Sequence, residues 1–206
     1  MRSRDKAFET RNVSTREHHV AFDNLTTRVA TPPTDRQTMN SKTTKLRPDY
    51  EISRVIKGGW QLAGDHGSVD RAAAVRDMEA FLDAGITTFD CADIYVGVEE
   101  MIGEFIADIR KTRGAEVANR VHVHTKLVPD LGLLADLRPV DVEAIIDRSL
   151  KRLRVERLDL VQFYWWDLSI GNPQSGLEVL KRCQEQGKIA HLGVNNWDSS
   201  DIQPFL

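Results

Sequence analysis

A five-fold alternation of strand-like and helix-like segments constrains the fold of this chain more than any other feature of its sequence. From Tyr50 onward, each short run rich in β-branched residues is followed by a polar or glycine-containing turn and a segment with helical periodicity. The runs end at intervals of 33, 36, 38 and 32 residues, near Lys57, Asp90, Lys126, Tyr164 and Asn196. Each interval fits one strand and one crossover helix, so the sequence predicts an α/β fold with a parallel sheet.

The helix-like segments carry apolar residues on one face and have recognisable ends. Met101, Phe105 and Ile109 recur at every fourth position, which is typical of a helix packed on a core. Pro139 and the pair Asn172-Pro173 are typical of first helical turns. The sequence therefore predicts helices that begin at these positions, the second of them stopping near Gly187.

Two architectures place helices behind parallel strands, namely the doubly wound sheet and the closed (β/α)8 barrel of the TIM type. The doubly wound dinucleotide fold requires GxGxxG after its first strand, and residues 58–63 (GGWQLA) do not match this pattern. A barrel brings the polar residues that end its strands together at one mouth. The chain has such residues at Asp90, Lys126, Tyr164 and Asn196, with Tyr95 just beyond the second run. These positions favour the barrel.

Residues 1–48 differ in composition from the rest of the chain. They hold 10 Lys and Arg against 5 Asp and Glu, together with 12 Ser and Thr. A segment of this kind buries too little apolar surface to offset its ordering entropy. We therefore expect residues 1–48 to be a disordered polar segment and residues 49–206 to form the folded domain. Because transit peptides usually carry fewer acidic residues, we expect a cytoplasmic protein, with an organelle matrix as the alternative.

Composition and spacing argue against several classes of protein. The folded part is acidic, whereas a nucleic-acid-binding protein needs a basic face. The chain has no run of about 18 apolar residues that could span a membrane. Cys91 and Cys183 are too few and too distant for a disulfide framework or a zinc site. His122 and His124 alternate as in the metal-binding strand of amidohydrolases, but the later strands lack the further ligands, so we expect no metal.

Four motifs in this sequence resemble the successive strand-end motifs of the aldo-keto reductases. They are DCADIY at 90–95, HTK at 124–126, DLVQF at 159–163 and LGVNN at 192–196. The resemblance extends over about residues 50–206 and is specific because the four motifs occur in order, one strand–helix unit apart. It implies a (β/α)8 barrel that reduces aldehydes and ketones with NADPH, needs no metal and takes a small carbonyl compound as its substrate.

The chemistry of carbonyl reduction supports this interpretation from the residues themselves. The developing alkoxide needs a proton donor, and a phenol of pKa about 10 donates poorly at neutral pH unless a cation stabilises its phenolate. We therefore expect Tyr95 to be the general acid, Lys126 the cation and Asp90 its partner in an ion pair. A salt bridge at the mouth of the barrel without a chemical role is the alternative for Asp90 and Lys126.

The resemblance also implies further site residues and one departure from the family pattern. The family has a histidine that orients the carbonyl oxygen where this chain has Tyr164. The Tyr164 hydroxyl either donates a hydrogen bond to the substrate or only packs with the tryptophans that follow. Gly59 and Trp60 resemble the residues beside the nicotinamide, and Asn195 and Asn196 those at its carboxamide, with a simple strand-end turn as the alternative. A non-catalytic or regulatory subunit that retains the cofactor site is the alternative function.

Five strand–helix units are visible where a barrel has eight. We therefore expect a barrel truncated after its fifth strand, as a fragment, a truncated gene product or half of an assembly. Such a sheet would have two exposed edges and an uncovered apolar face. We expect NADPH binding and reductase activity to be weak or lost in a chain of this kind.

Overall fold

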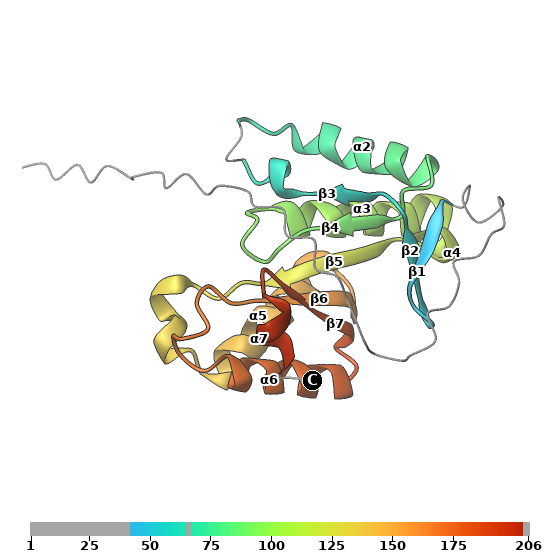
Figure 1. Cartoon of the computed structure of the whole chain (residues 1–206). Helices are drawn as coiled ribbons and strands as arrows, with labels where there is room; N and C mark the ends of the chain where they lie inside the picture. The colour runs from blue at the N-terminus through green and yellow to red at the C-terminus, as the bar shows by residue number, and fades with distance from the viewer. Residues whose placement is uncertain (1–41, 65–66, 204–206) are drawn as a thin grey trace, which may run out of the picture. The chain divides into compact units, whose positions relative to one another are not determined.

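A sheet of five parallel strands forms the centre of the molecule (Figure 1). The computed structural model describes residues 42–64 and 67–203, which belong to one compact unit, residues 40–206. The strands are paired in chain order as β3 (Ile56–Gly58), β4 (Thr88–Asp90), β5 (His122–Leu127), β6 (Leu158–Tyr164) and β7 (Ile189–Asn195). Each strand ends within one residue of the position that the sequence predicts.

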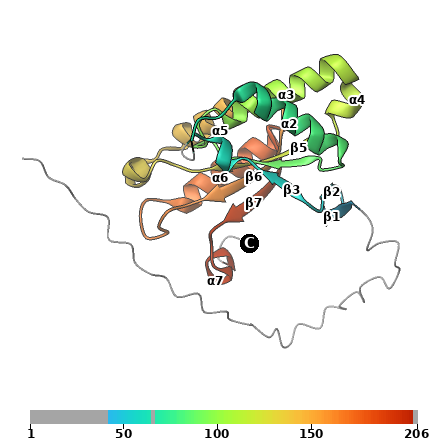
Figure 2. The same ribbon diagram turned by 90° about the horizontal axis from the view of Figure 1, so that it is seen from above.

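Four long helices bury their apolar faces against one side of this sheet. They are α2 (Arg71–Asp83), α3 (Val98–Arg113), α5 (Pro139–Leu153) and α6 (Pro173–Glu185). Figure 2 shows α2, α3 and α5 on one side of the strands, with the β1–β2 hairpin and α7 away from them. The short elements are η1 (Trp60–Leu62), α4 (Ala115–Ala118), η2 (Leu131–Asp136) and α7 (Ser199–Ile202). No helix in the two described ranges is long and apolar enough to cross a membrane.

The helix ends follow from local sequence. Asn172 lies before α6, and its side-chain oxygen accepts a hydrogen bond from the backbone N–H of Ser175 at 3.0 Å. Pro139 and Pro173 occupy the first positions of α5 and α6, where a missing backbone N–H carries no penalty. The chain leaves α6 through Gly187, whose φ of 81° lies in the left-handed region. The predicted limits of these helices are confirmed.

An antiparallel hairpin precedes the sheet, formed by β1 (Thr43–Arg47) and β2 (Tyr50–Ser53). The prediction of disorder over residues 1–48 is wrong for Thr43–Arg47, whereas residues 1–41 lie outside the described residues. The strand-like run that begins at Tyr50 is also two strands, β2 and β3, rather than one. Ser53 holds β2 against β4, because its Oγ accepts hydrogen bonds from the N–H groups of Thr87 and Thr88 at 3.2 and 3.0 Å. Backbone pairing orders this segment without an apolar signal in its sequence.

The face of the sheet opposite the helices is largely polar. Alternation along the strands places two adjacent rows on this face, Asp90, His124, Leu160 and His191 in one and Lys126, Gln162 and Gly193 in the other. Tyr50 and Ile52 of the hairpin pack against Leu160 there. In these two rows the one apolar side chain, that of Leu160, is covered by the hairpin, and an uncovered apolar face elsewhere on the sheet stays a prediction. As expected, β3 and β7 are the edge strands in this part of the chain.

Candidate active site

Lys126 and Asp90 form an ion pair at the carboxyl ends of the neighbouring strands β5 and β4. The Lys126 Nζ lies 2.6 Å from Oδ1 of Asp90, and the two side chains are 11% and 29% exposed. The same ammonium donates to the carbonyl oxygen of Cys91 at 2.8 Å, and Nε2 of Gln162 donates to Oδ2 of Asp90 at 3.2 Å. The predicted ion pair is therefore present. The Cys91 carbonyl orients the ammonium of Lys126, and the Gln162 amide orients the carboxylate of Asp90.

Gln162 is a site residue that the sequence reasoning missed. It pairs in register with Lys126 across β5 and β6, so its side chain lies on the same face of the sheet. The signal was its position two residues before Tyr164, since alternate residues of a strand share a face. Its amide binds Oδ2 of Asp90, whereas Lys126 binds Oδ1.

Tyr95 lies above this ion pair, in the turn between β4 and α3. Its ring centroid is 5.2 Å from the Nζ of Lys126, within the range of a cation–π contact. The turn is held by hydrogen bonds from the Tyr95 N–H to the Ala92 carbonyl at 3.0 Å and from the Val98 N–H to the Tyr95 carbonyl at 3.1 Å. The structure thus brings together the three residues for which the sequence predicts acid–base chemistry. Their role in catalysis stays a prediction.

Tyr164 ends β6 and is half-buried beside an aromatic neighbour. Its ring meets that of Trp166 edge-on, with centroids 5.0 Å apart, and Nε1 of Trp166 donates to the Pro129 carbonyl at 2.7 Å. Tyr164 is paired in register with Asn195 of β7, so it lies on the polar face above Gln162. The contact with Trp166 is the packing that one of the two alternatives describes, and a contact with substrate stays a prediction.

Three of the residues predicted to contact a cofactor lie at or just after the ends of the two edge strands. Trp60 begins η1 after β3 and is 53% exposed, whereas Asn195 ends β7 and Asn196 follows with a φ of 64°. Because all five strands are parallel, these residues share the carboxyl edge of the sheet with Lys126. An amide side chain both donates and accepts hydrogen bonds, so the two asparagines suit a carboxamide such as that of nicotinamide.

Gly59 has a packing reason for its identity. A Cβ at this position would lie 2.8 Å from both the carbonyl oxygen of Asp90 and a methyl group of Val98. The glycine therefore allows η1 to approach β4 and α3 closely, and its contact with a cofactor stays a prediction.

A cluster of aromatic and imidazole rings fills the polar face below the ion pair. The Tyr50 hydroxyl and Nε2 of His124 are 3.0 Å apart, and the Tyr50 ring stacks on His191 with centroids 4.3 Å apart. The ring of His122 meets Tyr50 edge-on at 5.4 Å. Burial lowers the pKa of His124 and raises the pKa of Tyr50. Within the described ranges, no group of three or more His, Cys, Asp or Glu side chains could hold a metal ion.

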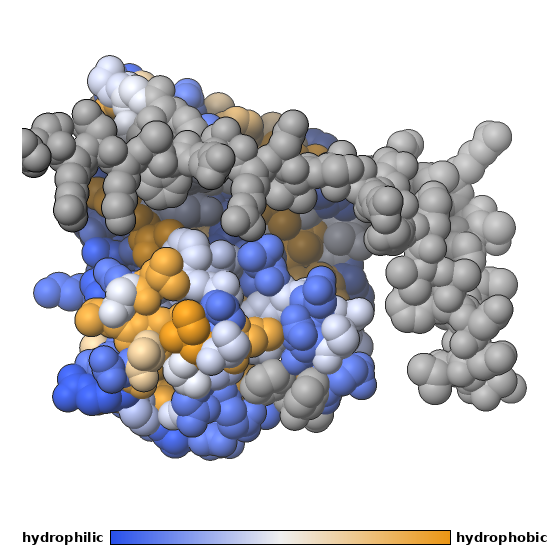
Figure 3. Space-filling view, turned by 60° about the vertical axis from the view of Figure 1, so that its left-hand side comes forward, coloured by the Kyte–Doolittle hydropathy of each residue, from blue (hydrophilic) through white to orange (hydrophobic). Residues whose placement is uncertain are grey.

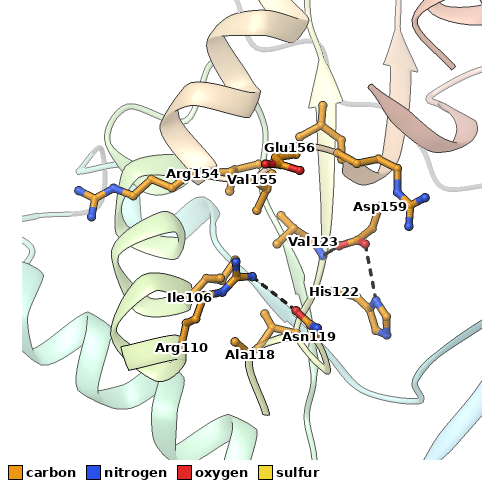
Figure 4. Close-up of a pocket in the computed structure, with 14 residues that line it drawn as sticks. Ile106, Arg110, Ala118, Asn119, His122, Val123, Arg154, Val155, Glu156 and Asp159 are labelled. Carbon is orange, nitrogen blue, oxygen red and sulfur yellow. Dashed lines mark hydrogen bonds and ion pairs between the residues drawn. The ribbon is translucent and has the colours of Figure 1, made fainter. Parts of the chain in front are cut away.

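A cavity of about 630 Å³ opens at the other end of the strands (Figure 4). Residues at the starts of β5 and β6 line it, among them His122 and Asp159, whose side chains approach to 3.8 Å. Figure 4 shows Arg110 directed toward Asn119 across the cavity, with Arg154 directed away. The cavity does not include Asp90, Tyr95 or Lys126, so it is separate from the candidate site.

Large apolar side chains are exposed in the loops that follow β5 and β6. Leu131, Leu133, Trp166 and Ile170 are 54%, 62%, 44% and 37% exposed. Figure 3 shows apolar residues gathered on the surface in a view turned toward this end of the molecule. The candidate site therefore lies beside an apolar rim, which suits the carbon skeleton of an organic substrate.

Comparison with known proteins gives a consistent result. The model of the Aldo/keto reductase family matches residues 54–205. An aldo-keto reductase of Bacillus subtilis is 28% identical over 158 residues, which are 75% of this chain and 46% of that protein. The glycerol dehydrogenase structure from Gluconobacter oxydans is 32% identical, with a TM-score of 0.65 over 81% of this chain and 52% of that one. An aldo-keto reductase from Klebsiella pneumoniae, in complex with NADPH, is 26% identical, with a TM-score of 0.58 over 74% and 49%.

The chain spans about half the length of the curated relatives that it matches. Its structural neighbours are (β/α)8 barrels of which it likewise covers about half. The predicted fold class is confirmed: the described residues form five consecutive strands of such a barrel with the helices between them.

Proposed function

Because this chain belongs to the aldo/keto reductase family, we propose that it is part of an enzyme that reduces aldehydes or ketones with NADPH. The observation that carries the proposal is the ion pair of Lys126 and Asp90 beneath the ring of Tyr95. An ammonium held in this place favours the phenolate that remains when Tyr95 gives up its proton. The parallel strands bring all three groups to the one edge at which barrels of this class carry their chemistry.

The described residues divide the reaction between them. Tyr95 donates its phenolic proton to the carbonyl oxygen as negative charge develops there, and the ammonium of Lys126 stabilises the resulting phenolate. Asp90 and Gln162 keep the ammonium in position. Asn195, Asn196 and Trp60 would hold the nicotinamide end of the cofactor, which when bound supplies the hydride for the carbonyl carbon.

NADPH is proposed as the cofactor because two related structures are described as complexes with NADPH or NADP. The proposed partner is a small carbonyl compound, in keeping with the apolar rim of the site, whereas the acidic composition of the folded part argues against nucleic acid. We also propose a cytoplasmic location, as the composition of residues 1–48 suggests. Weak activity of the 206-residue chain stays a prediction.

Steady-state oxidation of NADPH by small aldehydes, measured on a version of the protein completed to eight strands, tests the proposal. Tyr95→Phe removes the proton donor and keeps the ring, so we expect kcat to fall about 100-fold or more. Tyr50→Phe is the matched control, because it removes a tyrosine hydroxyl that contacts Nε2 of His124 and not the ion pair of Lys126 and Asp90. An unchanged rate in Tyr95→Phe would overturn the assignment of the acid. Binding of NADPH without turnover in the completed protein would indicate a non-catalytic cofactor-binding subunit instead.

A further inference from the structure

Two buried carboxylates lie on either side of Tyr95 in the chain, and the proposed reaction uses neither of them. The Asp93 side chain is 2% exposed and the Glu99 side chain is fully buried. Burial of a charged carboxylate is unfavourable unless partners compensate for the lost solvent. Their positions, two residues before Tyr95 and four after it, therefore require a structural account.

Glu99 is held by one hydroxyl and one guanidinium. The Thr125 hydroxyl donates to Oε1 of Glu99 at 2.8 Å, and the guanidinium of Arg152 lies 3.3 Å from Oε2. The same Arg152 nitrogen donates to the backbone carbonyl of Asp93 at 2.9 Å. Arg152 also pairs through Nε with Glu100 at 3.1 Å. One arginine of α5 therefore joins both ends of the segment that contains Tyr95.

Asp93 has a parallel set of partners. Its Oδ1 accepts a hydrogen bond from the Val128 N–H at 2.9 Å, and its Oδ2 pairs with the guanidinium of Arg148 at 3.1 Å. The Asp93 N–H in turn donates to the carbonyl oxygen of Lys126 at 3.1 Å. Burial raises the pKa of Asp93 to about 6, and the Val128 N–H and Arg148 act against that rise.

These contacts connect the Tyr95 segment to the strand that carries Lys126. Thr125 directly precedes Lys126, and Val128 follows it by two positions. Glu99 thus binds β5 just before Lys126, and Asp93 binds the backbone just after the end of β5. Arg148 and Arg152, one helical turn apart on α5, pair with these two carboxylates. The distance between the Tyr95 ring and Lys126 therefore depends on both carboxylates.

We propose that Asp93 and Glu99, together with Arg148 and Arg152, are positioning residues that hold Tyr95 over Lys126. The proposal rests on the proposed function for its purpose, although the geometry stands by itself. Apolar side chains of similar size would stabilise the fold about as well as buried ion pairs, but they would not impose one orientation on the turn. The proposed reaction uses none of these four residues directly, and the network acts through Tyr95.

Fluorine NMR on protein labelled with 3-fluorotyrosine tests the proposal directly. The chain has three tyrosines, at 50, 95 and 164, so Tyr→Phe variants assign each signal. We expect Arg152→Gln to shift or split the Tyr95 resonance and to leave those of Tyr50 and Tyr164 in place. Arg113→Gln is the matched control, because Arg113 pairs with Glu79 and Asp83 on the surface, and it should leave all three signals unchanged.

A second variant keeps the test decisive if Arg152→Gln does not fold. The Arg148 side chain is 46% exposed, so Arg148→Gln removes one partner of Asp93 with a smaller effect on stability. It should also move the Tyr95 signal. An unmoved Tyr95 resonance in folded Arg152→Gln or Arg148→Gln protein would overturn the proposal.

Kinetics separates a positioning role from a purely structural one. Displacing a catalytic group by about 1 Å can lower its rate about 100-fold, so kcat should fall at least about 10-fold in Arg152→Gln while KM for NADPH stays the same. Arg152→Lys, which retains the charge, should recover part of the lost rate. A parallel change in KM and kcat, with the Tyr95 signal in place, would contradict the proposal. Absence of turnover in a version completed to eight strands would count against the proposed function alone, since the NMR result on the 206-residue chain does not depend on it.

Discussion

Replacement of Lys126 by methionine measures how much stability the protein loses when the Asp90 carboxylate has no ion-pair partner. The lysine ammonium lies 2.6 Å from the carboxylate and 2.8 Å from the carbonyl oxygen of Cys91, with the side chain 11% exposed. Methionine has a similar length and no charge, so the substitution removes the ion pair with Asp90 and the hydrogen bond to Cys91 with little change in packing. Among the side chains described, Gln162 still donates its hydrogen bond to Asp90.

The expected loss of stability follows from the burial of the two side chains. Removal of one partner from a fully buried ion pair costs about 3–5 kcal/mol. Because Asp90 is 29% exposed and keeps one amide partner, solvent and Gln162 recover part of this, and we expect the free energy of unfolding to fall by about 2–3 kcal/mol. Adding Asp90→Asn removes the unpaired charge, so the double variant should be more stable than the sum of the two single changes predicts.

Urea unfolding followed by tryptophan fluorescence gives the free energies for the cycle. Lys188→Met is the matched control, because Lys188 pairs with Glu143 and Asp147 at 2.9 and 2.7 Å on the surface, where such pairs contribute about 0–1 kcal/mol. The reasoning is refuted if Lys126→Met destabilises no more than Lys188→Met, or if the two changes at the site are simply additive.

Three further predictions follow from single features. Burial lowers the pKa of His124 in the folded protein. The neutral histidine therefore contributes to stability above about pH 6.5, and this contribution is lost as the pH falls through the folded-state pKa. In urea titrations between about pH 7.5 and 5.5, the free energy of unfolding should fall less in His124→Gln than in the wild-type protein. Burial raises the pKa of Asp93 to about 6, which changes stability with pH in the opposite direction, but this effect is the same in both proteins and cancels in the comparison. Equal losses of stability in the two proteins would contradict the prediction. A Cβ at Gly103 would overlap a backbone oxygen of α5, so Gly103→Ala should lower the free energy of unfolding by about 1–3 kcal/mol in thermal or urea unfolding. Gly58 has open space around it, so Gly58→Ala should change the free energy of unfolding by less than about 0.5 kcal/mol. If the Tyr164 hydroxyl orients the substrate, Tyr164→Phe should lower kcat/KM and Tyr164→His should raise it again, and equal values in all three forms would mean that the residue only packs.

Local sequence patterns account for most of the fold. The strands and helices follow from apolar periodicity and from caps such as Asn172, which act over a few residues and are visible in any single segment. The hairpin was missed because Thr43–Arg47 has neither apolar alternation nor burial, and its order comes from pairing with β2. The division of the run from Tyr50 into β2 and β3 has the same cause, since β2 pairs with β1 and β3 with β4.

The sequence by itself determined that Asp90, Tyr95 and Lys126 would meet, because parallel strands end at one edge and each residue lies at or just beyond such an end. Only the tertiary structure decided what surrounds them. Gln162 reaches Asp90 from 72 positions away in the chain, and Arg152 reaches Glu99 from 53. Contacts of this kind depend on how α5 packs against α3 at Gly103, and no local pattern records the relative placement of two helices. The sequence identifies the charged site residues because they lie at the ends of successive strands. The partners that orient these residues depend on packing between distant segments of the chain.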